Sequence, residues 1–157
     1  MSKNIDQVYI ANPITSNAST DLMYFGQSPY TAGDDAAMTY ANFIAQVPST
    51  TWHDVASSPQ ALAVSQGYVT DNGASLVTYT LPVTAAVGTI IEISGKSSGG
   101  WIITYGTGQI IHVGNLTTTV TTGSVASTNQ WDYIKLLCVT ANTTWNVIGG
   151  VGNFTIV

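Results

Sequence analysis

The chain has 157 residues and a mass of 16.5 kDa, which is enough for one ordinary domain or a small domain with a structured arm. Only 7% of the residues are charged: three lysines, no arginine and eight acids give a net charge of −5. Three scattered lysines cannot form the basic face that binds phosphates, so the composition argues against a nucleic-acid partner. No segment approaches the roughly 20 apolar residues that span a bilayer, and we expect no membrane insertion.

Uncharged polar residues take the place of the missing charges, with 23 threonines, 14 serines and 10 asparagines. Valine and isoleucine together number 29 against 7 leucines, and such β-branched side chains favour strands over helices. Few charges are present to protect the edges of a sheet from association. We therefore expect a mainly β protein whose sheet edges are covered by sister subunits.

Residues 1–50 have a different sequence pattern from the rest of the chain, and this pattern predicts an N-terminal arm with one short helix. Residues 1–6 show no basic region followed by an apolar core, so we expect no secretory signal. Asp34 is suited to cap a helix, and apolar side chains recur at about helical spacing from Met38 to Ala45. Pro48 would end such a helix. The expected helix covers about residues 35–46.

Residues 51–157 read as strands and turns. Asp71-Asn72-Gly73 is a strong hairpin signal, because a type I′ turn needs positive φ at both central positions. The arms of this hairpin would be Ala61–Thr70 and Ser75–Leu81. Further strands are expected at Thr89–Ser94, Trp101–Tyr105, Gln109–Val113, Tyr133–Thr140, Thr143–Ile148 and Phe154–Val157. Short strands at this spacing predict an antiparallel β-sandwich or jelly-roll-like domain.

Motifs for catalysis and cofactor binding are weak throughout the chain. Zinc ligands at a workable spacing are lacking, although three copies of His112 would meet if that residue lay on a threefold axis. Cys138 lies in an apolar run and is expected to be a buried thiol. Glu92 and Asp132 are carboxylates without a recognisable catalytic setting. We expect no cofactor, no intrachain metal site and no enzymatic activity.

The aromatic residues offer a candidate binding site. Trp101 and Trp145 lie beside β-branched residues and are expected in the core. A tryptophan exposed beside amides could instead stack on a sugar. Trp131-Asp132-Tyr133 follows the polar stretch Ser124–Gln130, and for Trp131 both a core role and a binding role remain open. The candidate receptor-binding residues there are Asn129, Gln130, Trp131, Asp132 and Tyr133.

Several segments resemble the C-terminal or tip region of tail-fibre proteins of tailed bacteriophages and prophages. The resemblance covers the chain from about residue 10 to its end. It is carried by Asp21–Tyr30, Asp34–Thr39, Ala63–Val69, Leu81–Gly88, Gly99–Trp101, Gln109–His112 and Ala126–Asn129. It implies a homotrimeric fibre module exposed on a virion. Because no secretory signal is expected in residues 1–6, synthesis in the host cytoplasm is expected as well. It transfers no catalytic residue.

Three functions follow as expectations. The first is a virion tail-fibre protein that attaches, as a homotrimer, to a glycan or protein receptor on a bacterial surface. Residues 8–47 would then form the threefold contact, while residues 51–157 form the β-sandwich. The alternatives are a soluble carbohydrate-binding lectin without a virion role and, more weakly, a small polysaccharide depolymerase or esterase.

Overall fold

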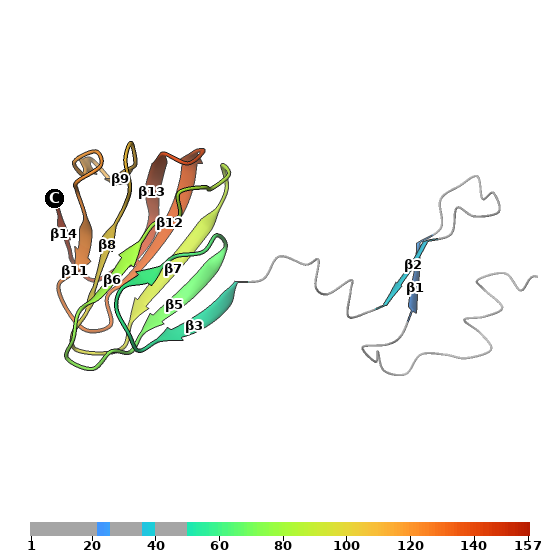
Figure 1. Cartoon of the computed structure of the whole chain (residues 1–157), viewed down its shortest axis with the longest axis horizontal. Coiled ribbons are helices and arrows are strands. Elements are labelled where there is room, and N and C mark those ends of the chain that lie inside the picture. Colours follow the sequence, from blue (N-terminus) through green and yellow to red (C-terminus); the bar gives the residue numbers. More distant parts are fainter. Residues whose placement is uncertain (1–21, 26–35, 40–49) are drawn as a thin grey trace, which may run out of the picture. The chain divides into compact units, whose positions relative to one another are not determined.

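A computed structural model describes residues 22–25, 36–39 and 50–157 of the chain (Figure 1). The chain divides into two compact units, Met1–Pro48 and Ser49–Val157. In the first unit, β1 (Leu22–Phe25) pairs antiparallel with β2 (Ala36–Thr39). The described residues contain no helix, and therefore none that is long and apolar enough to cross a membrane.

The helix expected over residues 35–46 is wrong where the structure describes that segment. Ala36–Thr39 is strand β2, and its backbone hydrogen bonds go to β1. A helix of about 12 residues is marginal on its own, so pairing with a second segment readily overrides a weak helical pattern. Residues 35 and 40–46 lie outside the described residues, as does most of the arm expected over residues 1–50.

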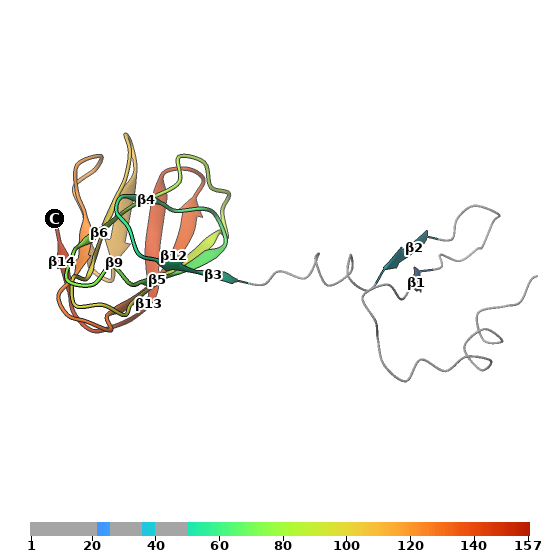
Figure 2. The same ribbon diagram turned by 60° about the horizontal axis from the view of Figure 1, so that its bottom comes forward.

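The second unit is a sandwich of two sheets, which Figures 1 and 2 show as separate layers. In order across the larger sheet, the strands are β10 (Leu116–Thr117), β9 (Ile110–Val113), β13 (Thr144–Val151), β12 (Tyr133–Thr140), β7 (Ile90–Gly95), β5 (Gln66–Thr70) and β3 (Thr51–Val55). In order across the smaller sheet, they are β14 (Phe154–Ile156), β11 (Val125–Ser127), β8 (Trp101–Thr104), β6 (Val77–Thr80) and β4 (Gln60–Ala61). The mainly β structure expected from composition and the β-sandwich expected from the strand spacing are confirmed.

The sheets are mixed rather than antiparallel, so the expected antiparallel, jelly-roll-like arrangement is wrong. Strands β3, β5 and β7 run parallel in one sheet, and β4, β6 and β8 run parallel in the other. From β3 to β8 the chain passes from one sheet to the other after each strand and returns one position further along. Residues 51–104 therefore wind as three stacked turns, in the manner of a short solenoid. Antiparallel strands β11 and β12 then pair with the last turn.

The hairpin expected around Asp71-Asn72-Gly73 is also wrong. The segment does reverse the chain, and Gly73 has the expected positive φ of 60°, but Asn72 does not share it. The chain passes here from β5 in one sheet to β6 in the other. Thr70 and Tyr79 face each other across the sandwich, with 2.9 Å between their hydroxyl oxygens. The two strands thus present their inward faces to each other across the core, whereas a hairpin would place both strands in the same sheet.

The core lies between the sheets and follows the alternation expected from the sequence. Val77 and Tyr79 are fully buried, whereas Thr78 between them is partly buried and Thr80 after them is exposed. Trp101 and Trp145 are also fully buried, which confirms their expected place in the core. Cys138 is a buried free thiol, as expected.

Candidate functional site

The candidate receptor-binding residues lie on the loop between β11 and β12 and on the first residue of β12. The structure brings them to one end of the sandwich, beside the turn that follows β7. Backbone N–H of Gly95 donates to the carbonyl of Asp132 at 2.9 Å, which joins the two segments. The loop is defined here by the residues Thr128–Tyr133 and is called the Trp131 loop.

Asp132 shapes this loop from within. Asp132 is only 4% exposed. Its Oδ2 accepts the backbone N–H groups of Thr128 and Asn129, each at 2.9 Å. Its carbonyl also accepts the indole N–H of the buried Trp101 at 3.1 Å. The carboxylate therefore satisfies backbone donors and holds the loop in one conformation.

Trp131 is the exposed aromatic residue of the loop. It is 64% exposed. Its φ is +71°, in the left-handed region that a bulky L-residue rarely adopts. Such a conformation costs about 1–3 kcal/mol and persists where neighbouring contacts enforce it. Here the buried Asp132 follows directly, so the same contacts that bury the carboxylate hold the indole in solvent.

Gln130 and Asn129 are fixed beside this indole. The Gln130 side chain donates from Nε2 to the carbonyl of Lys96 at 2.7 Å. Asn129 donates from Nδ2 to the hydroxyl of Thr128 at 2.9 Å. Each amide thus uses one N–H within the protein, and its remaining polar groups can meet a ligand.

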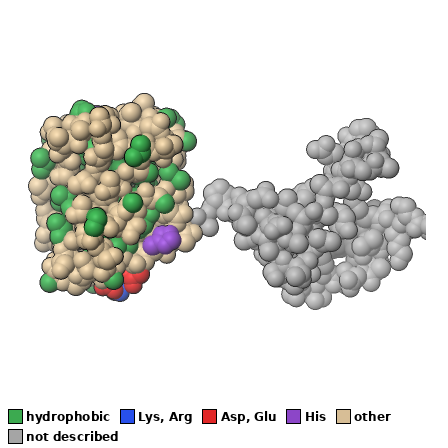
Figure 3. Space-filling model, in the orientation of Figure 1, with side chains coloured by type: hydrophobic (Ala, Val, Ile, Leu, Met, Phe, Trp, Pro, Cys, Tyr) green, Lys and Arg blue, Asp and Glu red, His purple; other side chains and the backbone are tan. Residues whose placement is uncertain are grey.

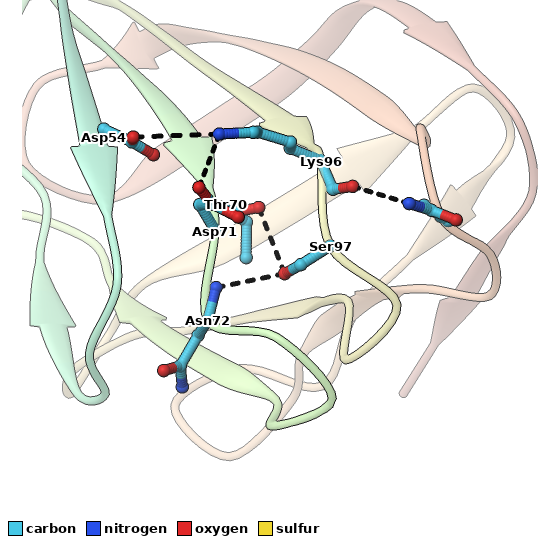
Figure 4. A network of polar contacts seen from close by, with 7 residues as sticks. Asp54, Thr70, Asp71, Asn72, Lys96 and Ser97 are labelled. Atoms are coloured by element: carbon cyan, nitrogen blue, oxygen red, sulfur yellow. Dashed lines mark hydrogen bonds and ion pairs between the residues drawn. The ribbon is translucent and has the colours of Figure 1, made fainter.

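A small charged network adjoins the loop through Lys96 (Figure 4). The Lys96 ammonium lies 2.5 Å from Asp71 Oδ2 and 3.9 Å from Asp54 Oδ2. The hydrogen bond with Asp71, followed by the charge of Asp54, raises the pKa of Lys96. The face in Figure 3 is mostly uncharged, and its acidic and basic side chains gather at one end of the sandwich. Asp54, Asp71 and Lys96 belong to three different turns of the winding, so no local pattern in the sequence indicated this network.

Tyr133 turns away from the loop onto the outer face of the larger sheet. Its hydroxyl donates to Glu92 Oε2 at 2.6 Å, and Glu92 Oε1 lies 3.1 Å from the Lys135 ammonium. The hydrogen bond from Tyr133 and the nearby Lys135 lower the pKa of Glu92 despite partial burial. Burial and the bond to Glu92 raise the pKa of Tyr133 to about 12. The structure thus groups Asn129, Gln130 and Trp131 as one exposed surface and places Tyr133 in another cluster.

His112 is a partly exposed residue of β9. Its Nδ1 lies 2.9 Å from the hydroxyl oxygen of Thr117 on the neighbouring strand β10. Among the described residues, no three His, Cys, Asp or Glu side chains come together as metal ligands.

Comparison with known proteins assigns no family to this chain. No protein-family model matches it, and no curated protein has significant sequence similarity to it. The Trp131 loop, its charged surroundings and the resemblance described from the sequence are therefore the basis for a functional proposal.

Proposed function

We propose that this chain is a homotrimeric subunit of a bacteriophage or prophage tail fibre, and that it attaches the virion to a receptor on a bacterial surface. The assignment to tail fibres depends on the resemblance of its segments to that family. The observation that best supports an attachment role is Trp131, an exposed indole in a strained conformation on a firmly hydrogen-bonded loop. The protein acts by binding, without a cofactor.

Recognition by the Trp131 loop follows from its chemistry. A large aromatic side chain held in solvent buries much apolar area when a partner covers it, and it loses little conformational freedom. The amides of Asn129 and Gln130 supply hydrogen bonds at its side. Tryptophans in such positions commonly dominate the energetics of an interface.

A binding role is favoured over catalysis by the surroundings of the two candidate carboxylates. Asp132 is buried and bonded to backbone N–H groups, and Glu92 is paired with Tyr133 and Lys135. A depolymerase would need one such group free to protonate or attack the scissile bond. Release of reducing ends from bacterial polysaccharide, abolished in Asp132→Asn or Glu92→Gln, would contradict the proposal.

The second candidate function is a soluble lectin without a virion role, and the same exposed indole favours it. Particle composition separates the two functions. A fibre subunit is recovered in purified virions by mass spectrometry, whereas a free lectin is recovered only from the lysate.

The decisive variant is Trp131→Ala. Fluorescently labelled full-length protein is applied to a panel of bacterial strains, and its adsorption is compared with that of the variant on strains that bind it. We expect adsorption to fall by at least about tenfold, as for an aromatic hot spot, with the oligomer intact. The matched control is Val83→Ala, which shortens an exposed apolar side chain away from the loop. Equal adsorption by Trp131→Ala would contradict a role for the loop.

A further inference from the structure

The outer face of the larger sheet carries a row of residues in register across neighbouring strands. Trp52 of β3 lies opposite Gly67 of β5, and Gly67 lies opposite Glu92 of β7. Glu92 in turn lies opposite Lys135 of β12. The buried residues on either side of Glu92, Ile91 and Ile93, face the core, so this row faces outward.

The Trp52 indole lies on the backbone of Gly67. A Cβ atom at residue 67 would come within 2.5, 2.7 and 2.8 Å of three atoms of the indole ring. Three similar distances to bonded ring atoms mean that the ring covers this position with its face. Trp52 is nevertheless 45% exposed, so the opposite face of its indole ring is open to solvent. Glycine is required at residue 67 because any side chain there would displace the ring.

Beside this ring stands a fixed set of hydrogen-bonding groups. Glu92 lies one strand beyond Gly67, a spacing of about 4.8 Å, which is within the width of one sugar ring. Its two carboxylate oxygens are held by Tyr133 and Lys135, and the 14% of the Glu92 side chain that is exposed leaves room for one further hydrogen bond from a ligand. The Lys135 ammonium likewise has donors beyond its bond to Glu92.

We propose that Trp52, Gly67, Glu92 and Lys135 form a binding site for a neutral pyranose sugar, separate from the Trp131 loop. The open indole face would stack on the apolar face of the sugar, while Glu92 accepts and Lys135 donates hydrogen bonds to its hydroxyls. A neutral ligand is specified because Lys135 is already paired with Glu92, which leaves no uncompensated cation for an acidic or phosphorylated sugar. The net charge of −5 also disfavours anions. The site goes beyond the proposed attachment by Trp131 and does not depend on it.

The test is titration of the full-length protein with methyl glycosides of glucose, galactose, mannose and N-acetylglucosamine. Saturation-transfer NMR reports which glycoside binds, and tryptophan fluorescence reports the contact, since Trp101 and Trp145 are fully buried. We expect saturable binding of at least one glycoside, with a dissociation constant of about 1 mM for a ligand of this size. No saturable signal with any of the four would overturn the proposal.

Variants then assign the site. Trp52→Ala removes the ring, and Gly67→Ala displaces the ring without removing it. Each should weaken glycoside binding by about tenfold or more. Glu92→Gln should weaken glycoside binding as well. Val87→Ala, at an exposed apolar residue elsewhere, should bind as the parent does. Circular dichroism and melting curves show which variants are folded. If Trp52→Ala does not fold, Glu92→Gln decides, and unchanged binding in that variant overturns the proposal.

Binding that is lost in Trp131→Ala but kept in Trp52→Ala would place the sugar on the Trp131 loop and overturn the second site. Glycoside binding that is lost in Trp52→Ala but kept in Trp131→Ala, together with bacterial adsorption that still depends on Trp131, supports two separate sites. Failure of the attachment proposal appears in the adsorption assay alone, so the two proposals can be distinguished.

Discussion

At the scale of single residues, the Asp132 carboxylate illustrates how the Trp131 loop is held in one conformation. It accepts two backbone N–H groups and lies against Gly152, where a Cβ atom would come within 1.9 Å of its Oδ1. Gly152 also has a φ of +99°. The close fit between the loop and the chain before β14 therefore requires a glycine at residue 152, because a side chain there would collide with the Asp132 carboxylate.

Asp132→Ala should lower the free energy of unfolding by about 1–3 kcal/mol, because it leaves two backbone donors without their acceptor. Asp132→Asn keeps the shape and an acceptor oxygen, so its loss should be smaller. Urea denaturation of the two variants measures the difference. Equal stability of Asp132→Ala and the parent protein would show that the loop does not depend on this carboxylate.

The lowered pKa of Glu92 predicts that the stability of the protein depends on pH. The pKa of Glu92 in the folded protein lies below the ordinary value of 4.5, chiefly because Tyr133 donates to it. Its stabilising contribution is therefore complete above that ordinary value and is lost as the pH falls through the folded pKa. The fall in unfolding free energy between about pH 6 and pH 3 should be smaller in Glu92→Gln than in the parent protein. Identical slopes in urea denaturation would contradict the prediction.

At this scale the sequence was informative where neighbouring residues shared a property. Trp101 and Trp145, each beside β-branched residues, were correctly expected in the core. Asp132 was grouped with Trp131 for its position in the sequence, but the structure buries the first and exposes the second. Burial of a polar residue depends on partners such as the N–H groups of Thr128 and Asn129, which no apolar pattern reveals.

At the scale of elements, the turns between the two sheets are joined to one another by hydrogen bonds. Ser97, in the turn after β7, accepts the N–H of Asn72 at 3.0 Å and donates to the carbonyl of Thr70 at 3.3 Å (Figure 4). The backbone N–H groups of Lys96 and Ser97 also donate to Thr70. The second and third turns of the winding are thus held together at this end.

Ser97→Ala should lower the free energy of unfolding by about 1 kcal/mol, because the Asn72 N–H loses its acceptor. Ser98→Ala, at the exposed neighbouring serine, should leave stability unchanged and serves as the matched control. Thermal unfolding followed by circular dichroism measures both variants. An equal effect of the two substitutions would argue against a stabilising bond between the turns.

Strand positions were more predictable than strand partners. β12 has the bounds expected from its apolar run, and β7, β8, β9, β13 and β14 start at or next to the expected residue. The turn at Asp71-Asn72-Gly73 was also placed correctly, yet the strands on its two sides enter different sheets. Local residues specify where a chain reverses, whereas the choice of partner depends on which faces become buried. Short strands such as β11, in a polar stretch, gave too weak an alternation to be detected.

At the scale of the whole molecule, the second unit contains its own core and both sheets. We therefore expect a fragment of residues 49–157 to fold by itself and to show the circular dichroism of β structure. If the arm provides the threefold contact, light scattering after gel filtration should give the full-length protein three times its chain mass of 16.5 kDa and the fragment a monomer. A monomeric full-length chain would contradict the proposed trimer. A trimeric fragment would place the contact on the sandwich instead.

The stacked winding of residues 51–104 has an evolutionary consequence. Each turn rests mainly on the turn before it and the turn after it, so a duplicated turn could be accommodated between existing ones with its backbone hydrogen bonds satisfied. The antiparallel strands that carry the Trp131 loop would keep their own partners. A lineage could thereby lengthen this module, or a laboratory could insert copies of a turn into it, without changing the residues of the Trp131 loop.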